Sequence, residues 1–504
     1  MNLRLMLETA ARKYGGKTAV AMDERRLSYA QLDEAANKVA NALLGMGVKK
    51  GDRVAMLLSN SPEFAAIYFG VVKIGGIAVP LDTKYKLAEL ASLFNDSQPR
   101  VLVAESSFLA PIAPALGEFK SIAGVIEVGS EYKGQFLSYQ EIMDSSPSKL
   151  VAVELRGEDI AHIAYTSGPS FSPRGVVMSH QALVREAAIS GDGFQQTDKD
   201  IVVLFALPMH HAFGLVVILL TAITKGSTVV MLGGLSINSL LEVIEREKAT
   251  VFMAVPFVHA LIVNTAEEEG IHHDLSSLRL WGTAGATMPA DIWQKIKQHF
   301  GFSAVDFWGM TESAAHVTCQ SPDGAGKPGS VGKALPGWEL KIVDDDGREL
   351  PPNQPGEVVV RGPIMKGYYN NPEATAEVIE NGWLHTGDIG RVDEEGWLFL
   401  LASRKKDMLI AKGQNIYLSD IEQVLASHPK VAEIAVVGIP DEIRGEKPRA
   451  FIRLKAGKVA TEQEIKKFCL ERLANYKVPK EFIFADSLPK TADGKIDKNS
   501  LRGK

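Results

Sequence analysis

Residues 165–175 form the segment whose side chains are best suited to hold a polyphosphate. The segment follows the strand-like stretch 160–165, is rich in Ser, Thr, Gly and Pro, and ends with a cation at Arg174 followed by Gly175. Backbone N–H groups, hydroxyls and a guanidinium can together bind phosphate oxygens. The same composition is also typical of ordinary surface turns, so this segment by itself leaves both interpretations open.

Further polar or glycine-rich segments follow along the chain. They occupy residues 208–214, 282–286, 308–312, 385–388, 403–407, 412–417 and 491–495. Taken singly, each has an ordinary structural explanation: Glu312 can begin a helix, Asp388 can lie in a turn, and Trp308 can belong to the core. Arg404 and Lys406 can belong to a solvated charged face. The order of the segments is therefore more informative than any one of them.

Adjacent histidines occur twice, at His210 and His211 and at His272 and His273. Zinc sites in helices use two histidines one turn apart, and other zinc sites add cysteines close by. Neither pair has this spacing or a cysteine nearby. The sequence therefore does not predict a zinc site.

The composition excludes several classes of protein. The 504 residues include 55 Lys and Arg against 61 Asp and Glu, a net charge of −6, which makes nucleic acid an unlikely partner. Two cysteines cannot form a disulfide framework. The N-terminus lacks the unbroken apolar core of a secretory signal, and the most apolar run, 214–223, is too short to cross a bilayer. We therefore expect a soluble, cytoplasmic protein with no integral membrane segment.

The periodicity of the sequence predicts the elements that must position these segments. A capping box at Ser28 begins a predicted helix that ends at Gly45, and a further helix is predicted over 462–475. Apolar runs at 54–58, 77–81, 101–104, 228–232 and 251–255 alternate with helical segments, as in buried parallel sheets with helices on both faces.

After about residue 335 the pattern changes to short strands and tight turns, which predicts an antiparallel, β-barrel-like part. The predicted fold class is therefore α/β, with a large N-terminal domain of βαβ-type sheets plus this small part, over residues 1–402. A small α+β C-terminal domain follows over residues 403–504, joined by the charged stretch 403–407.

In their order and spacing, the segments at 165–175, 208–214, 282–286, 308–312, 385–388, 403–407, 412–417 and 491–495 resemble the motifs of the acyl-adenylate-forming (ANL) superfamily. This superfamily includes AMP-forming acyl-CoA synthetases and aryl-CoA ligases, and the resemblance covers nearly the whole chain. It implies an acid–thiol ligase that uses ATP and Mg²⁺ to convert a carboxylic acid to an acyl-adenylate, and then transfers the acyl group to coenzyme A. It also implies a mobile C-terminal domain with a hinge near Lys406.

The resemblance implies roles for individual residues. Glu312 resembles the Mg²⁺ ligand, Asp388 the carboxylate that binds the ribose, and Trp308 the ring that stacks on adenine. The implied catalytic residues are Lys495, Thr311, Glu312 and His211. The implied nucleotide- and CoA-binding residues are Thr166, Ser167, Gly168, Ser170, Arg174, Gly285, Ala286, Trp308, Gly309, Asp388, Arg404 and Gly413.

Three positions bear on the acid. His211 matches the histidine beside the acyl site of the superfamily, which favours a plain carboxylic acid over an amino acid. Gly309 stands where acetate-activating relatives have a tryptophan that fills the acyl pocket, so a medium-chain, long-chain or aryl acid is favoured over acetate. Phe307 stands where many relatives have glycine, and its effect on the site is left open.

The phosphate-binding segment departs from the superfamily. Members usually have Thr-Thr-Gly and a lysine where this chain has Pro169, Ser170, Phe171 and Arg174. The loop could still work through Ser167, Ser170 and Ser172.

If the loop is impaired, the enzyme would mainly convert preformed acyl-adenylates to thioesters or use a carrier-protein thiol. A third alternative is a nucleotide-binding pseudoenzyme. The expected partners are the acid, ATP and CoA, and a homodimer is left open.

Overall fold

A computed structural model of the chain describes residues 1–129, 135–149, 153–166, 173–286, 288–302, 304–324, 326–403, 408–411, 414–441, 445–490, 496 and 498–502. The chain divides into two compact units. The first comprises Met1–Thr83, Ser97–Tyr165 and Gly175–Arg404, and the second comprises Lys84–Asp96, Thr166–Arg174 and Lys405–Lys504. No helix in the described part of the chain is long and apolar enough to span a membrane.

The first sheet of unit 1 is parallel through its centre and carries several of the predicted motifs. Its strand order is β16 (Lys333–Ala334), β15 (Thr318–Cys319), β14 (Val305–Trp308), β13 (Leu280–Thr283), β12 (Val251–Ala254), β10 (Ile201–Leu204), β11 (Thr228–Met231), β1 (Thr18–Met22) and β2 (Arg25–Ser28). The strands from β14 to β1 are parallel, and the edge pairs β1–β2, β14–β15 and β15–β16 are antiparallel.

A second sheet in this unit is parallel from β8 to β7. Its order is β19 (Gly367–Tyr368), β9 (Arg174–Ser179), β8 (Ile160–Thr166), β4 (Ile77–Pro80), β3 (Arg53–Leu57), β5 (Val101–Glu105), β6 (Gly124–Val128) and β7 (Leu137–Ser138). The apolar runs predicted as buried parallel strands coincide with β3, β4, β5, β11 and β12. The α/β fold class is thereby confirmed.

Helices cover these two sheets. Those of unit 1 are α1 (Leu3–Tyr14), α2 (Tyr29–Gly45), α3 (Pro62–Lys73), α5 (Ser106–Leu109), α6 (Tyr139–Ser145), α7 (His180–Gly193), α8 (Thr221–Lys225), α9 (Ile237–Glu247), α10 (Pro256–Glu268), α11 (Ala290–Phe300) and α12 (Pro372–Val378). Short helical turns lie at Ala113–Glu118 and Thr311–Ser313, and Phe213–Leu220 is a π-helix.

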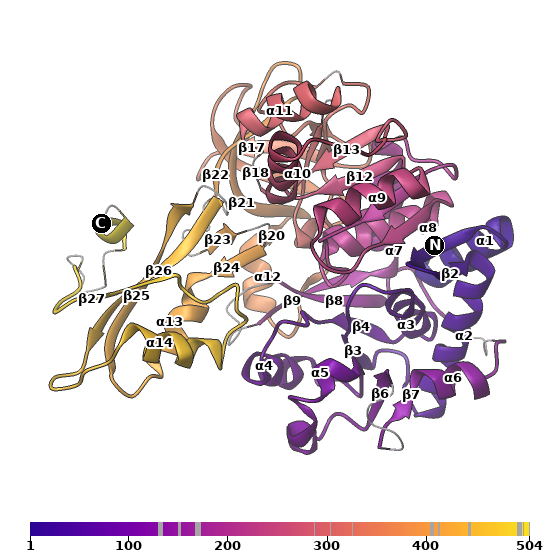
Figure 1. Cartoon of the computed structure of the whole chain (residues 1–504), viewed down its shortest axis with the longest axis horizontal. Coiled ribbons are helices and arrows are strands. Elements are labelled where there is room, and N and C mark those ends of the chain that lie inside the picture. Colours follow the sequence, from indigo (N-terminus) through magenta and orange to yellow (C-terminus); the bar gives the residue numbers. More distant parts are fainter. Residues whose placement is uncertain are drawn as a thin grey trace. The chain divides into compact units, whose positions relative to one another are not determined.

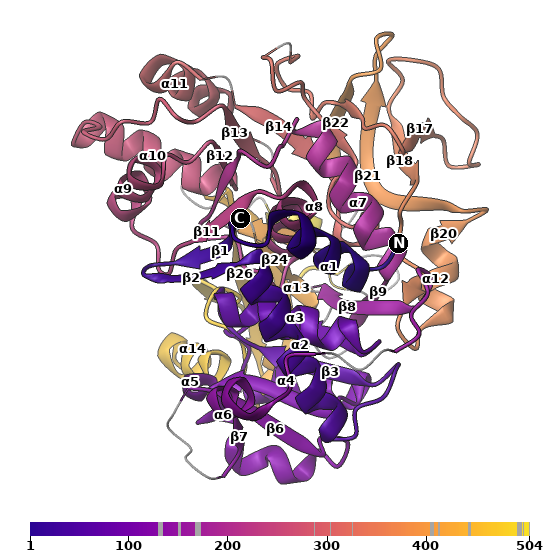
Figure 2. The same ribbon diagram turned by 90° about the vertical axis from the view of Figure 1, so that its right-hand side faces the viewer.

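One helical layer is shared by the two sheets. Helix α3 contacts β1 and β2 of the first sheet and β4 of the second, and α2 and α1 pack beside it (Figure 2). The opposite side of the first sheet is covered by α9 and α10, which lie over β12 and β13 (Figure 1). Ser28 caps α2 and forms the predicted capping box with Gln31.

An antiparallel sheet completes unit 1, as the strand and turn pattern after residue 335 predicts. Its order is β17 (Glu339–Val343), β18 (Gly356–Arg361), β21 (Trp383–Val392) and β20 (Ile379–Glu380), with β22 (Leu398–Ser403) also paired to β21. The core of unit 1 is continuous across all three sheets, from Leu3 in α1 to Leu398 in β22. This continuity holds the sheets at fixed positions within the unit.

Unit 2 contains a small sheet and helices, as the predicted α+β pattern requires. The sheet order is β24 (Gln414–Tyr417), β23 (Met408–Ala411), β26 (Gly445–Leu454) and β25 (Val431–Asp441), with β27 (Glu481–Phe484) paired to β26. The helices are α4 (Leu87–Ser97), α13 (Leu418–Ala426), α14 (Glu462–Leu470) and α15 (Asn499–Arg502).

The sequence pattern predicts a helix over 462–475, which is too long, since α14 ends at Leu470. The backbone N–H of Ala474 donates to Oε2 of Glu89 at 3.0 Å instead of continuing the helical ladder. The same carboxylate accepts from Lys477 Nζ at 2.8 Å, and Lys477 also donates to Asp420 Oδ2 at 3.0 Å. A buried ion cluster within unit 2 therefore ends this helix.

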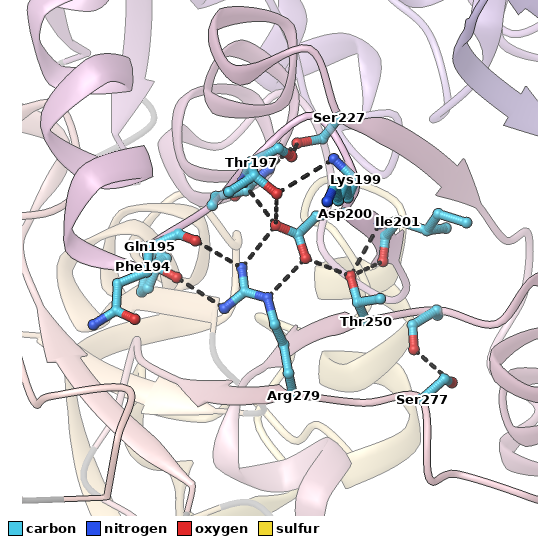
Figure 3. Close-up of polar contacts among 12 residues, drawn as sticks. Phe194, Gln195, Thr197, Lys199, Asp200, Ile201, Ser227, Thr250, Ser277 and Arg279 are labelled. Atoms are coloured by element: carbon cyan, nitrogen blue, oxygen red, sulfur yellow. Dashed lines mark hydrogen bonds and ion pairs between the residues drawn. The ribbon is translucent and has the colours of Figure 1, made fainter.

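A second polar cluster ties together the amino ends of the central strands in the first sheet (Figure 3). Asp200, which directly precedes β10, accepts from Arg279 Nε at 2.7 Å, Arg279 Nη2 at 2.8 Å and Thr250 Oγ1 at 2.7 Å. Arg279 and Thr250 directly precede β13 and β12, and Arg279 also donates to the Phe194 carbonyl at 3.1 Å. Burial acts to raise the pKa of Asp200, but the hydrogen bonds from Arg279, Thr250 and the Thr197 backbone outweigh it and lower the pKa.

The variant Asp200→Asn tests this cluster. We expect the free energy of unfolding near neutral pH to fall by about 2 kcal/mol, less than for a fully buried pair because Arg279 keeps some contact with solvent. Since the folded-state pKa is lowered, Asp200 stabilises the fold above its unfolded pKa of about 3.9 and loses this effect as the pH falls through the folded value. The free energies of unfolding of the variant and the parent, measured with urea, should therefore converge at acidic pH.

The matched control is Asp346→Asn, which removes the exposed partner of Arg348. Its free energy of unfolding should change by no more than about 0.5 kcal/mol. Equal losses in the two variants would contradict the assigned role of Asp200.

Candidate active site

The carboxyl ends of neighbouring parallel strands bring three of the predicted motifs to one edge of the first sheet. β13 leads into residues 284–286, β14 into residues 309–312, and β10 into residues 208–214. β13 and β14 pair in parallel register, with Gly282 opposite Val305 and Thr283 opposite Asp306. Ligands of open α/β sheets bind at this edge. The Asp200 cluster lies at the opposite, amino edge.

Trp308 and Asp388, 80 residues apart in sequence, meet in the structure. The indole Nε1 of Trp308, at the end of β14, donates to Oδ2 of Asp388 in β21 at 3.1 Å. The Asp388 N–H in turn donates to Oγ1 of Thr386 at 3.1 Å, and that hydroxyl donates to the Val358 carbonyl at 2.7 Å. The contact fixes an aromatic ring beside an oriented carboxylate, an arrangement that can bind a purine ring and sugar hydroxyls.

A tight turn after β14 presents Thr311 and Glu312. Ser313 Oγ accepts from the Met310 N–H at 3.0 Å and donates to the Met310 carbonyl at 3.0 Å, which closes the helical turn Thr311–Ser313. Gly309 has no room for a side chain, because a Cβ there would lie 2.2 Å from the Ala315 carbonyl oxygen. Glycine at this position is therefore required by packing, whatever the size of the acyl pocket.

The buried carboxylate of Glu312 is held by the segment around β19. The hydroxyl of Tyr368 donates to Glu312 Oε1 at 2.9 Å, and the Met365 N–H donates to the Glu312 carbonyl at 2.8 Å. Among the described residues no group of three or more His, Cys, Asp or Glu could hold a metal. One oriented carboxylate fits Mg²⁺, which commonly binds one or two carboxylates together with substrate phosphates and water.

The segment 282–286 is anchored by a pair that sequence analysis did not find. Trp281 Nε1 donates to Nδ1 of His259 at 2.6 Å, so the ring proton of His259 lies on Nε2 and is donated to the Gly282 carbonyl at 3.1 Å. Burial lowers the pKa of His259 to about 4, which keeps the ring neutral. Gly285 has φ +85° and is exposed, as the close approach of a ligand to the backbone would require.

The segment 208–214 is fixed by Asn60. Its side-chain amide donates to the Leu207 carbonyl at 2.9 Å and accepts from the Met209 N–H at 2.7 Å. The ring of Phe213 packs edge-on against Phe307 of β14, with centroids 5.2 Å apart. His211, which is half-buried, therefore lies on a segment that contacts the strand carrying Trp308.

The segment 165–175, which is predicted to bind phosphate, is only partly described. β8 ends at Thr166 and β9 begins at Arg174. The predicted site residues Ser167, Gly168, Ser170, Arg404, Gly413 and Lys495 lie outside the described residues. Their roles stay predictions.

Comparison with known proteins identifies the class. The family model of AMP-binding enzymes matches residues 7–369, and that of the AMP-binding enzyme C-terminal domain matches residues 420–495. The chain belongs to the family of AMP-binding enzymes and is an adenylate-forming acid–CoA ligase, as the ordered motifs predict.

Individual relatives match over almost their full length. The chain is 32% identical to a long-chain-fatty-acid–CoA ligase of Bacillus subtilis, with 99% of this chain and 94% of the relative aligned. It is 35% identical to the indoleacetate–CoA ligase of Aromatoleum aromaticum, over 97% of this chain and 95% of the relative. A variant of the o-succinylbenzoate CoA synthetase of Bacillus subtilis, solved with a product analogue, has a TM-score of 0.88 and 31% identity, covering 99% and 98% of the two chains.

Removing the Tyr368 hydroxyl tests whether it orients Glu312. In Tyr368→Phe, we expect the Mg²⁺ concentration that half-saturates carboxylate-dependent ATP–pyrophosphate exchange to rise roughly tenfold, because partners that orient a metal ligand typically contribute 10–100-fold to metal affinity.

Tyr68→Phe is the control, since it removes a buried phenolic hydroxyl that has no hydrogen-bond partner among the described residues. Its Mg²⁺ dependence should match that of the parent protein. An unchanged Mg²⁺ dependence in Tyr368→Phe would contradict the role assigned to that hydroxyl.

Proposed function

We propose that the protein activates a medium-chain, long-chain or aryl carboxylic acid with Mg-ATP and transfers the acyl group to coenzyme A. The observation that carries the proposal is the Trp308–Asp388 contact at the strand edge that also presents Thr311 and Glu312. An aromatic ring beside a carboxylate offers the groups that an adenosine needs for stacking and for hydrogen bonds from its ribose hydroxyls. Glu312, which follows Trp308 closely in the chain, adds a buried carboxylate for a metal.

In the first half reaction, a carboxylate oxygen of the acid attacks the α-phosphorus of ATP. The new O–P bond forms as the bond between the α- and β-phosphates breaks, and pyrophosphate leaves. Mg²⁺ bound at Glu312 would supply positive charge to offset the repulsion between the two anions. Thr311 would bind the α-phosphate, and Lys495 would supply a cation to the developing charge.

In the second half reaction, the thiol of coenzyme A attacks the acyl carbonyl, the C–O bond to phosphate breaks, AMP leaves, and the thiol proton passes to solvent. We propose that the domain formed by residues 403–504 turns about a hinge near Lys406 between the two steps, relative to residues 1–402. The turn would withdraw Lys495 and bring Gly413 to the pantetheine channel. Arg404 would contact the sugar of the bound nucleotide.

Several observations support the proposed class of acid. The aligned relatives include enzymes named for long-chain fatty acids and for indoleacetate. Gly309, which stands where acetate-activating relatives have a tryptophan, is required by its packing against Ala315 and therefore does not itself support a larger acid. His211 lies on the segment that contacts Phe307, in keeping with a site for an uncharged acyl group. A cytoplasmic location is a further prediction from the sequence, which leaves a homodimer open.

The test is to measure AMP and acyl-CoA by mass spectrometry after incubating the protein with Mg-ATP, coenzyme A and a panel of short, medium, long and aryl carboxylates. We expect both products to rise together with a medium, long or aryl acid and not with acetate. Release of ADP in place of AMP, or a preference for acetate, would contradict the proposal.

Two further reactions separate the alternatives. Thioester formation from a synthetic acyl-adenylate and coenzyme A, without activity from any free acid, would indicate an enzyme specialised for the second half reaction. Acyl transfer to a phosphopantetheine carrier protein in preference to coenzyme A would indicate a carrier-dependent enzyme. Nucleotide binding without either reaction would indicate a pseudoenzyme.

A further inference from the structure

Glu186, in the middle of α7, is a fully buried carboxyl group to which the proposed mechanism assigns no role. It accepts from Trp338 Nε1 at 3.0 Å and from Ser190 Oγ at 3.3 Å. Ser190 in turn contacts the ring of His316, whose Nδ1 lies 3.0 Å from Ser190 Oγ. Side chains from three separate parts of unit 1 are therefore linked at this carboxyl group.

The first branch of this network leads to the turn that presents Thr311 and Glu312. His316 follows that turn, and its ring Nδ1 lies 3.0 Å from Oγ of Ser190, which donates to Glu186. The His316 ring also stacks on Phe194, with centroids 4.5 Å apart and an angle of 17° between the planes. The side chain of His316 is therefore held by Ser190 of α7 and by Phe194, the residue that follows this helix.

The turn requires such an anchor because its backbone is strained. Ala314 and Ala315 have φ angles of 54° and 98°, a region that residues with a side chain rarely occupy. Conformations of this kind persist only where surrounding contacts hold them. Gly309 packs against the Ala315 carbonyl on one side, and His316 is held by α7 on the other.

The second branch reaches Glu312 from the opposite direction. Trp338 lies against the backbone of Gly362, where an added Cβ would be 2.6 Å from the indole ring. The chain continues from Gly362 to Met365 and Tyr368, which donate to the Glu312 carbonyl and carboxylate. Glu186 is therefore connected through packed groups to both sides of Glu312.

We propose that Glu186 is a positioning residue that sets the geometry of Thr311 and Glu312. It acts through His316 on the turn and through Trp338 on the segment that holds the Glu312 carboxylate. This inference rests on the proposed function, in which Glu312 binds the metal of Mg-ATP. Glu186 itself touches neither the nucleotide nor the metal.

The environment of Glu186 indicates which variant is conservative. Burial raises the pKa of Glu186 well above its ordinary range, and hydrogen bonds from Trp338, Ser190 and the His316 backbone lower it only in part. Glutamine keeps the shape and an acceptor oxygen, so Glu186→Gln should retain most of the network. Glu186→Leu removes every acceptor, leaves the buried indole N–H of Trp338 unpaired and releases Ser190 from this position.

A matched control exists in the same unit. Glu127 in β6 is also a buried glutamate, and it accepts from the hydroxyl of Ser106 at 2.6 Å. Glu127→Leu therefore removes a buried, serine-bonded carboxyl group at a strand of the second sheet. It should lower the thermal midpoint without affecting the turn after β14.

The first readout is hydrogen–deuterium exchange of the peptide covering residues 309–317, which requires no activity. The N–H groups of Ala314 and Ala315 donate within the turn, to the carbonyls of Thr311 and Met310. We expect their exchange to be about tenfold faster in Glu186→Leu and close to that of the parent in Glu186→Gln and Glu127→Leu. If Glu186→Leu does not fold, Ser190→Ala takes its place, with an expected increase of about threefold.

The second readout separates the half reactions, well below the thermal midpoint of each variant. Glu186→Leu should raise the half-saturating Mg²⁺ concentration for ATP–pyrophosphate exchange about tenfold, because the metal ligand is displaced. Thioester formation from a synthetic acyl-adenylate involves no attack on ATP, so the metal bound at Glu312 has no part in it. Its rate should change by less than about twofold. If Glu186 had a purely structural role, Glu186→Leu would lower the rates of both half reactions together.

The outcomes are decisive for Glu186. Faster exchange at 309–317 together with a raised Mg²⁺ requirement, both restored by Glu186→Gln, would support the proposal. Equal effects of Glu186→Leu and Glu127→Leu on both readouts, or no effect on the turn, would overturn it. If the parent protein shows no carboxylate-dependent exchange of pyrophosphate, the proposed function fails, and hydrogen exchange alone then decides whether Glu186 positions the turn.

Discussion

The hydrogen bond between Trp308 and Asp388 joins the parallel sheet to the antiparallel sheet at the point where the candidate site is formed. Trp308 ends β14, and the position of β14 depends on its pairing with β13. Asp388 lies in β21, which pairs with β18, and the Val358 carbonyl of β18 accepts a hydrogen bond from the Thr386 hydroxyl. In the proposed site this ring and this carboxylate contact one nucleoside, which requires that they be held within a few tenths of an ångström. The continuous core beneath both sheets is what makes that precision possible.

Around this contact, the candidate site residues lie on short turns, and buried polar groups beneath the turns hold them by hydrogen bonds. His259 holds the carbonyl of Gly282, Asn60 holds the backbone of the 208–214 segment, and Tyr368 holds Glu312. Each of these side chains forms hydrogen bonds with the groups that it orients, as buried polar groups must. The turns can therefore keep exposed backbone, such as that of Gly285, in a fixed conformation.

The elements with regular patterns were predictable from sequence, and so was the family. The helix begun by Ser28 and the apolar strands β3, β4, β5, β11 and β12 follow from local periodicity, which needs no knowledge of distant partners. The end of α14 at Leu470 was not predictable, because the group that ends it, Glu89, lies far away in sequence. For the same reason Tyr368, His259 and Glu186 carried no signal, since each matters through a partner that only the folded chain brings near.

The order and spacing of their motifs predict Trp308, Asp388 and Glu312 as site residues, and their roles toward nucleotide and metal stay predictions. The prediction that Gly309 opens the acyl pocket is incomplete, since packing against Ala315 also requires glycine there. The most direct test of the central claim is a crystal structure of the protein with a non-hydrolysable acyl-adenylate. We expect the adenine on the face of Trp308, the ribose hydroxyls on the Asp388 carboxylate and the phosphate beside Thr311, whereas a nucleotide bound away from Trp308 and Asp388 would contradict it.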